Sequence, residues 1–275
     1  MSTISNYYLN NISKKIRIDI VKSLFYAKSG HLGGCLSLTD ILTTLYFAIM
    51  NHDPKNPKWE LRNRLILSNG HTAPALYVTL AHANYFDIKK IYTLRKLNSP
   101  LQGHPSLLHH LPGIESSSGS LGQGLSIAIG IALALKINNI DSKTYVILGD
   151  GELNEGQIWE AAMAATHHNL NITAIIDKNN LQIDGKTSEV MNTEPLTEKW
   201  KSFGWKTHNI NGHSFPQLTK TLQNNKLYKS PTVIIANTIM GKGIKSIENN
   251  HLWHGKVPSS KKELNQFIEQ INNNC

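Results

Sequence analysis

Apolar side chains recur at every fourth position over residues 12–24, which is the spacing of one buried face of an α-helix. Ser37 and Asp40 then form a capping-box pattern at the start of a second apolar run with helical spacing. This pattern predicts that a second helix begins near Ser37 and ends before Asp53-Pro54.

Short, continuous apolar runs further along the chain are typical of strands that are buried on both faces. They lie at residues 64–67, 145–148, 172–176 and 232–236, and residues 207–210 are predicted as a further strand. Helical patterns lie between several of them, most clearly over residues 124–137 and 157–168. Strands joined through helices of this length predict crossover connections. We therefore expect an α/β fold, a doubly wound parallel sheet with helices on both faces.

The chain has 275 residues, 40% of them hydrophobic, which is enough for one domain with its own core. We predict that this domain covers residues 1–260 and that a polar C-terminal tail covers residues 261–275. The best candidate for a membrane span, residues 125–137, is short and interrupted by polar residues, and residues 1–11 lack the apolar centre of a signal peptide. We therefore expect a soluble cytoplasmic protein with no membrane partner.

The formal net charge of +9 is compatible with a nucleic-acid partner or with an anionic small substrate. The lysines are scattered along the chain, and no aromatic residues are interleaved with them as stacking platforms. A bias in amino-acid usage throughout the chain accounts for the charge more simply. We therefore predict no nucleic-acid partner, whereas an anionic small substrate fits either explanation.

The junction Gly149-Asp150-Gly151 lies between a predicted strand and a predicted helix. Glycines let the backbone approach a phosphate closely, and the N–H groups at the start of a helix favour an anion. Asp150 supplies a hard oxygen ligand, and Asn179 supplies a second one at the same sheet edge if the two strands are neighbours. Magnesium prefers oxygen ligands and commonly bridges protein groups and phosphates. Alone, Gly-Asp-Gly is an ordinary turn, but the spacing to Asn179 favours a metal and diphosphate site.

Two segments resemble the thiamine-diphosphate motif in the form that is found in transketolases: GDGELNEG over residues 149–156 and DKNNLQIDG over residues 177–185. The resemblance implies the thiamine-diphosphate-binding fold, with thiamine diphosphate and Mg²⁺ as cofactors and Ca²⁺ or Mn²⁺ as substitutes for the metal. It assigns the metal ligands to Asp150, the side chain of Asn179 and the carbonyl of Leu181. We choose Asn179 rather than its neighbour Asn180, which lies one residue away from the ligand position of the family.

The same resemblance assigns contacts to the cofactor. Gly151 and Asn179 would bind at the diphosphate, and Ile183 would lie against the thiazolium ring. The loop Gly119-Ser120-Leu121 resembles the segment that packs along the cofactor in the family. Glu155 matches a glutamate at the interface between cofactor domains, but an acid in the first turn of a helix explains it equally well.

Three histidines, His31, His71 and His104, lie beside glycine or proline, and His254 lies in a late Trp-His-Gly-Lys segment. Each alone is most simply a turn residue. Together, in order and separation, they are similar to the histidines of transketolases, where they would line the cofactor and substrate channel. The resemblance implies catalytic roles for His31, His104 and His254, and it directs His71 and His254 toward the diphosphate.

The resemblance covers nearly the whole chain, although Leu32 replaces a proline and Ser106 replaces an acidic residue that are usual in the family. It implies transfer of a two-carbon ketol unit from a ketose phosphate to an aldose phosphate, as in the pentose phosphate pathway. The segment MGKGI over residues 240–244 looks like transketolases made as two chains. A separate C-terminal transketolase subunit is therefore expected as partner, with two copies of each chain and sugar phosphates as substrates.

Two alternatives remain open from the sequence. The chain could be the diphosphate-binding subunit of another thiamine-diphosphate enzyme, of the 2-oxo acid dehydrogenase or deoxyxylulose-phosphate synthase type, because these share the metal motif. It could also be a non-catalytic remnant of the same fold. The set of His31, His71 and His104 favours transketolase over the first alternative. Asp150, Asn179 and the four histidines together count against the second.

Overall fold

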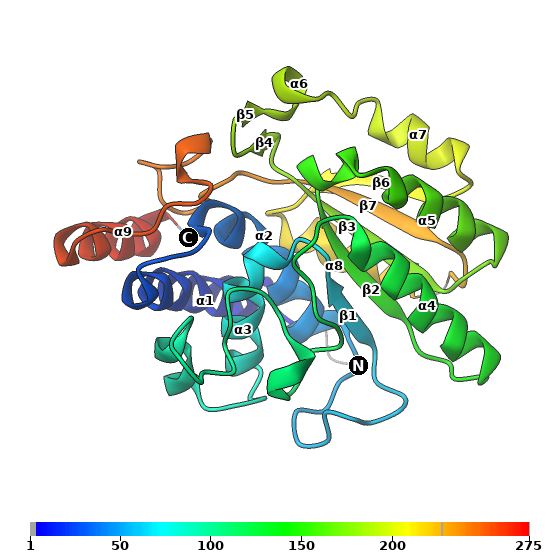
Figure 1. The fold of residues 1–275 in the computed structure, drawn as a ribbon, viewed down its shortest axis with the longest axis horizontal. Coiled ribbons are helices and arrows are strands. Elements are labelled where there is room, and N and C mark those ends of the chain that lie inside the picture. Colours follow the sequence, from blue (N-terminus) through cyan, green and yellow to red (C-terminus); the bar gives the residue numbers. More distant parts are fainter. Residues whose placement is uncertain (1–3, 227, 275) are drawn as a thin grey trace.

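The computed structural model describes residues 4–226 and 228–274. Its main sheet has five parallel strands in the spatial order β1-β2-β3-β7-β6, with helices on both faces (Figure 1). The strands are β1 (Arg64–Leu67), β2 (Thr144–Gly149), β3 (Ile172–Lys178), β6 (Lys206–Asn211) and β7 (Thr232–Asn237). The predicted α/β fold is confirmed, and each predicted apolar run lies within one of these strands.

The helices divide between the two faces of the sheet (Figure 1). One face is covered by α1 (Asn6–Ala27), α2 (Leu32–Thr44), α3 (Ala73–His82), α8 (Phe215–Asn225) and α9 (Lys261–Asn274). The other face is covered by α4 (Gln123–Ile137), α5 (Gly156–His167) and α7 (Leu196–Ser202). A two-stranded hairpin, β4 (Leu181–Gln182) with β5 (Gly185–Lys186), and the short helix α6 (Thr187–Val190) follow β3.

The strands β1, β2, β3 and β7 each contribute alternate side chains to two separate apolar cores. Leu65 and Leu67 pack into the core beneath α1, α2 and α3, whereas Ile66 packs into the core beneath α4 and α5. Successive side chains of a strand point to opposite faces, so a strand between two layers of helices must be apolar throughout. This is the physical reason for the continuous apolar runs in the sequence.

The predicted start of the second helix at Ser37 is wrong, because α2 begins at Leu32. Ser37 and Asp40 are buried inside the helix and bind partners in other elements instead of capping its end: Ser37 donates to Asp177, and Asp40 pairs with Arg17. The helical run Leu32–Ile49 is also long and apolar enough for a membrane span by composition, but 89% of it is buried inside the fold. Its apolar composition is that of a core helix.

The predicted polar tail over residues 261–275 is also wrong as far as residue 274, because this segment forms helix α9. Leu264, Phe267 and Ile271 are spaced three and four residues apart and bury one face of the helix in the first core. Nζ of Lys14 in α1 donates to the carbonyl of Asn272 at 2.9 Å. The tail therefore belongs to the same packed unit as the rest of the chain.

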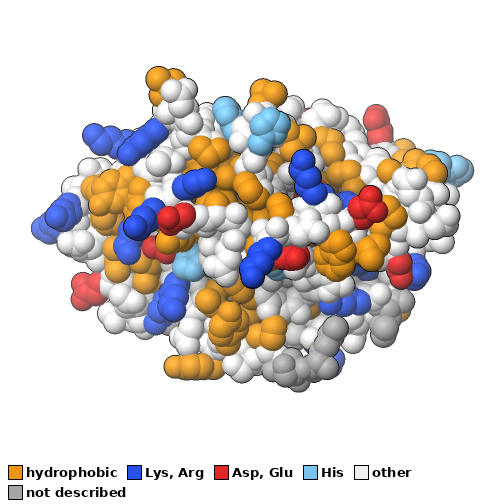
Figure 2. Space-filling view, turned by 90° about the horizontal axis from the view of Figure 1, so that it is seen from below, with side chains coloured by type: hydrophobic (Ala, Val, Ile, Leu, Met, Phe, Trp, Pro, Cys, Tyr) orange, Lys and Arg blue, Asp and Glu red, His pale blue; other side chains and the backbone are white. Residues whose placement is uncertain are grey.

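On the face drawn in Figure 2, lysine and arginine side chains are scattered among acidic and apolar ones and form no continuous band. A nucleic-acid interface normally gathers its cations along the path of the phosphates. The expectation that the chain has no nucleic-acid partner stays a prediction.

Candidate active site

A cavity of about 430 Å³ lies at the carboxyl ends of β2 and β3, which pair in parallel with Gly149 opposite Asp177. The condition on which the predicted site depends, that the two strands are neighbours, is therefore met. Ligands of parallel α/β sheets bind at this edge. The predicted site residues that line the cavity are His31, His71, His104, Gly119, Leu121, Asp150, Gly151, Asn179, Leu181, Ile183 and His254.

Ser120 is the predicted site residue that the structure leaves outside the cavity lining. It is exposed, although Gly119 and Leu121 on either side of it line the cavity. The side chain of Ser120 therefore does not contribute to the cavity wall in this structure.

Asp150 is held by the backbone at the end of β2. Its Oδ1 accepts from the backbone nitrogen of Gly151 at 2.9 Å, and its Oδ2 accepts from that of Asn180 at 2.6 Å. Burial, together with the negative charge of Asp177, raises the pKa of Asp150 to about 7. A nearby cation would offset both causes, which is what a metal ligand requires.

Asn179 and Leu181, the other two predicted metal ligands, line the same cavity as Asp150. The side chain of Asn179 is buried, and its Oδ1 accepts from the backbone nitrogen of Leu181 at 3.0 Å. Asn180 is exposed and is not among the described residues that line the cavity, whereas Asn179 is; the choice of Asn179 as a metal ligand stays a prediction. Ile183, in the turn between β4 and β5, is 66% exposed and presents an apolar side chain at the cavity.

Asp177 is a cavity residue that the sequence patterns did not identify. Its carboxylate is buried and accepts from the hydroxyls of Ser37 in α2 and Thr238 after β7, both at 2.5 Å. Burial raises its pKa even though both hydroxyls favour the ionised form. An acidic residue that ends a buried strand, two positions before Asn179, was the available signal.

Glu152 is a second buried acid that the sequence patterns passed over. It accepts from the hydroxyl of Ser68, from the backbone nitrogen of Gly122 at 2.7 Å and from that of Gly149 at 3.0 Å. Burial raises its pKa. The carboxylate therefore joins the loop that contains Gly119 to the turn at Asp150, and it acts as a structural anchor of the cavity wall.

Glu155 is exposed and lies directly before α5, where its side chain caps no backbone group. It is not among the described residues that line the cavity. Its position at the start of a helix suits an acidic residue. The interface role that the resemblance implies stays a prediction.

Three of the predicted histidines form one cluster. The ring centroid of His31 lies 5.0 Å from that of His71 and 5.6 Å from that of His254, and those of His71 and His254 lie 5.3 Å apart. Burial, followed by the repulsion of neighbouring histidines, lowers the pKa of His31 to about 4 and that of His71 to about 3. Burial also lowers the pKa of His254. All three imidazoles are therefore neutral at pH 7.

His104 lies beside this cluster on a loop whose backbone is fixed by the hydroxyl of Tyr77, which donates to the His104 carbonyl at 3.0 Å. Burial, and then the positive charge of Arg95, lowers the pKa of His104. The imidazole of His104 lies beside Gly119. A Cβ added to Gly119 would lie 3.7 Å from this ring. The four histidines thus come from four separate segments of the chain and meet around one cavity.

Several polar atoms in the cavity wall are buried without a hydrogen-bond partner among the described residues. They are Asn69 Oδ1, His31 Nδ1, Gln182 Nε2 and His254 Nδ1. Buried polar groups are normally paired, so unpaired groups that face one cavity indicate a polar ligand. Gly151 also faces Gln182, where an added Cβ would come 2.9 Å from the side-chain oxygen, so a larger residue here would require the Gln182 side chain to shift.

The donor set suits a diphosphate-bound magnesium ion better than a metal held by the protein alone. Over residues 4–226 and 228–274, no three His, Cys, Asp or Glu side chains gather into a metal-binding group. Asp150, the oxygen of Asn179 and the carbonyl of Leu181 supply three hard oxygens, and phosphate oxygens would complete an octahedral set. The residues present therefore fit magnesium together with a diphosphate.

Comparison with protein families places the chain among known proteins. Residues 9–272 match the family model described as transketolase, thiamine diphosphate binding domain. An apulose-4-phosphate transketolase subunit of Phocaeicola vulgatus is 41% identical over 267 residues, which cover 94% of this chain and 94% of that protein. A 6-deoxy-6-sulfo-D-fructose transketolase subunit of Clostridium sp. is 40% identical, over 93% of this chain and 90% of that protein.

Solved structures agree with the sequence relatives. The transketolase of Campylobacter jejuni superposes with a TM-score of 0.91 at 34% identity and covers 98% of this chain. The transketolase of Leishmania mexicana superposes with a TM-score of 0.89 at 28% identity. This chain spans 43% and 41% of those two chains, so the similarity covers less than half of each solved protein.

Proposed function

We propose a function for this chain on the premise that it belongs to the transketolase family, whose thiamine diphosphate binding domain it matches over residues 9–272. The chain is the diphosphate-binding half of a two-chain transferase that moves a two-carbon ketol unit from a ketose phosphate to an aldose phosphate. The observation that carries this proposal is that the cluster of His31, His71 and His254 shares one cavity with Asp150 and Asn179.

In this proposal, Asp150, Asn179 and the carbonyl of Leu181 hold Mg²⁺, for which Ca²⁺ or Mn²⁺ can substitute, and Gly151 lets the diphosphate approach the backbone. Bound thiamine diphosphate supplies a nucleophilic carbon and a ring that accepts electrons when a carbon–carbon bond beside a carbonyl breaks. The exposed apolar side chain of Ile183 supports a contact with that ring.

The histidines orient the substrate and move its protons. His31 and His104 are proposed to hydrogen-bond the hydroxyl and the developing alkoxide of the donor sugar. His254 assists proton transfer, because a neutral imidazole can accept a proton on one nitrogen while it donates from the other. His71 and His254 also face the diphosphate. The low pKa values of His31 and His71 support this assignment because they keep both rings neutral at working pH.

The partner is proposed to be a separate C-terminal transketolase subunit, with two copies of each chain. The relative in Phocaeicola vulgatus is named as one subunit of a transketolase and has nearly the same length as this chain, which supports a two-chain arrangement. The substrates are sugar phosphates, and the complex works in the cytoplasm. A place in the pentose phosphate pathway stays a prediction, because relatives act on apulose 4-phosphate and on 6-deoxy-6-sulfo-D-fructose by their names.

The two alternatives from the sequence are treated differently: one is set aside on the comparisons, and the other requires an experiment. Assignment to a 2-oxo acid dehydrogenase or a deoxyxylulose-phosphate synthase is set aside, because the family model and the relatives compared above are transketolases. The non-catalytic remnant is the alternative that an experiment must exclude. Four histidines around one cavity count against it, since a binding scaffold has no need of them.

The proposal is tested by isolating the chain natively with whatever co-purifies, and by assaying ketol transfer with added thiamine diphosphate and Mg²⁺. We expect one second protein and activity that depends on both additions. His31→Ala should lower turnover by orders of magnitude, whereas His167→Ala, at an exposed site in α5, should leave it unchanged. Cofactor binding without any transfer activity in the complex would favour the non-catalytic remnant.

A further inference from the structure

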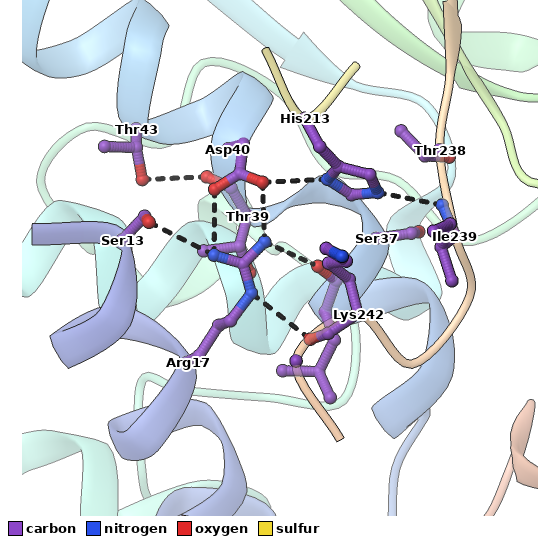
Figure 3. Close-up of polar contacts among 12 residues, drawn as sticks. Ser13, Arg17, Ser37, Thr39, Asp40, Thr43, His213, Thr238, Ile239 and Lys242 are labelled. Carbon is purple, nitrogen blue, oxygen red and sulfur yellow. Dashed lines mark hydrogen bonds and ion pairs between the residues drawn. The ribbon is translucent and has the colours of Figure 1, made fainter. Parts of the chain in front are cut away.

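A buried network of polar side chains joins α1, α2 and the segments that follow β6 and β7 (Figure 3). In α1, Arg17 places Nη1 2.8 Å from Oδ1 and Nη2 2.7 Å from Oδ2 of Asp40 in α2. His213, after β6, places Nδ1 2.8 Å from the same Oδ2. On the other side of its ring, Nε2 lies 2.8 Å from the backbone nitrogen of Ile239, after β7.

These contacts define the protonation pattern of His213. The backbone N–H of Ile239 can only donate, so Nε2 of His213 must accept and carries no hydrogen. The carboxylate of Asp40 can only accept, so Nδ1 of His213 carries the hydrogen and donates it. His213 is therefore the neutral tautomer with hydrogen on Nδ1, and it connects α2 to the segment after β7 through one rigid ring.

The two segments that His213 connects also hold Asp177 in the cavity wall. Ser37 lies one helical turn before Asp40 in α2 and donates to one oxygen of Asp177. Thr238 lies directly before Ile239 and donates to the other oxygen. The distance between these two hydroxyls depends on how α2 packs against the segment after β7. The same packing therefore determines the orientation of the Asp177 carboxylate.

The packing of α2 against the segment after β7 also determines the distance between His31 and His254. His31 lies directly before the first residue of α2, and the segment after β7 leads to His254. Gly241 in this segment donates to the carbonyl of Gly33 in the first turn of α2 at 3.0 Å. Gly33 cannot be larger, because an added Cβ would lie 2.6 Å from Cγ of Met240.

We propose that His213 is a positioning residue of the active site, which acts through Asp40 and Ile239 to seat α2 against the segment that leads to His254. His213 is not among the described residues that line the cavity, so it acts through the groups that it connects. The consequence for cofactor binding rests on the proposed function. The consequence for the geometry of His31 and His254 does not.

Two substitutions break the two links one at a time. His213→Gln can place its amide oxygen near the position of Nε2 and accept from Ile239, but it loses the donor to Asp40. His213→Asn can place its amide nitrogen near Nδ1 and donate to Asp40, but it loses the acceptor for Ile239. The exposed His167, at the end of α5, offers the matched control His167→Gln.

The first measurement is calorimetric binding of thiamine diphosphate with Mg²⁺ to the full chain in its native complex with the co-purified second protein. Both His213 variants, folded by circular dichroism, should bind at least tenfold more weakly than the wild type, and the control should bind normally. Affinities within twofold of the wild type in both His213 variants would overturn the proposal. A wild-type chain that binds no thiamine diphosphate would count against the proposed function instead, and the second measurement then decides about His213.

The second measurement needs no ligand and uses the side-chain ¹⁵N signals of the histidine-labelled full chain at pH 7.5. Wild-type His213 should show hydrogen on Nδ1 alone, and the signals of His31 and His254 should shift in both His213 variants but not in the control. Hydrogen on Nε2 in the wild type would overturn the proposal even if neither variant folds. A lower melting temperature with unchanged His31 and His254 signals would show a purely structural role and would also overturn it.

Discussion

Oδ2 of Asp150 lies 2.6 Å from the backbone nitrogen of Asn180, so the carboxylate at the end of β2 is bonded to the backbone that follows β3. Its other oxygen accepts from the backbone nitrogen of Gly151 at 2.9 Å. Both bonds come from the main chain and do not depend on another side chain. The proposed metal ligand is therefore oriented before any ligand binds, which lowers the cost of assembling the site.

Asp150→Asn should separate ligand binding from stability. We expect metal-dependent binding of thiamine diphosphate to weaken at least 100-fold, because the amide supplies no negative charge to the metal. The free energy of unfolding of the ligand-free chain at pH 8 should change by less than about 1 kcal/mol, since removal of a buried charge offsets the loss of one backbone hydrogen bond. Calorimetry and urea unfolding measure the two effects.

The control for that experiment is Asp141→Asn, which removes the same charge from an exposed residue outside the cavity. It should bind the cofactor and the metal like the wild type. Normal binding by Asp150→Asn itself would remove Asp150 from the metal site.

Metal binding should release a proton near neutral pH. The pKa of Asp150 is raised to about 7 by burial and by the charge of Asp177, so below pH 7 the metal must displace a proton from this carboxyl. Affinity for Mg²⁺ in the presence of thiamine diphosphate should therefore rise between pH 6 and pH 8. Calorimetry at pH 6.5 in two buffers with different ionisation enthalpies should give different heats, and at pH 8.5 this difference should shrink.

His71 should cost the chain stability in acid. Burial, followed by the charges of neighbouring histidines, lowers its pKa to about 3, so the unfolded chain binds a proton below pH 6.5 that the folded chain does not. The cost grows as the pH falls from 6.5 toward 3, and at pH 5 it reaches up to about 2 kcal/mol for this one residue.

His71→Gln removes that proton linkage and supplies the measurement. The loss of unfolding free energy between pH 7.5 and pH 5 should be smaller in the variant than in the wild type, as measured by urea denaturation at each pH. The variant must be compared with the wild type because Asp150 has an opposite effect: its raised pKa makes the folded chain more stable as the pH falls from 7. This effect is common to both proteins and cancels when their losses are subtracted. Equal losses in both proteins would show that His71 protonates freely in the folded state.

Arg17→Met should be strongly destabilising because it leaves the buried carboxylate of Asp40 without its main partner. Burial alone would raise the pKa of Asp40, but the charge of Arg17 and the hydrogen bond from His213 outweigh it and lower that pKa well below its usual range. Breaking one partner of a buried pair typically costs about 3–5 kcal/mol. The same pairing makes stability fall when the pH is low enough to protonate Asp40.

The exposed ion pair of Lys186 and Glu189 provides the comparison for this prediction. Glu189→Gln should leave the urea midpoint unchanged, because both side chains remain in water. A double variant, Arg17→Met with Asp40→Leu, should recover part of the stability that Arg17→Met loses, since no buried charge is left unpaired. If Arg17→Met alone unfolds at the wild-type midpoint, the pair contributes nothing to stability.

The sheet and the ends of its strands were predictable because they follow from local patterns. The continuous apolar runs identify strands that are buried on both faces, and Asp150 and Asn179 lie directly after two of them. Motif spacing alone was enough to bring these two side chains to one sheet edge. The histidine cluster needed a resemblance, since nothing local indicates that His31 and His254 meet.

The parts that could not be predicted depend on contacts between residues far apart in the chain. The position of Asp177 two residues before Asn179 was a local signal, but its hydrogen bonds with Ser37 and Thr238 are visible only in the structure. The capping-box pattern at Ser37 and Asp40 was misleading for the same reason, because a polar pair inside a helix has the same spacing whether it caps or reaches another element. Helix α9 was missed since its apolar positions are few.

The division of the interior into two cores places the sheet as a partition between two separate groups of apolar side chains. Because protein interiors are close-packed and transmit strain, a change of side-chain volume beneath α4 and α5 reaches α2 and α3 through the strands of the sheet. The histidines His31 and His71 belong to loops on one side of that partition, whereas the turn at Gly151 leads into α5 on the other. A substitution in either core can therefore shift these histidines relative to the turn at Gly151, even though it contacts neither of them.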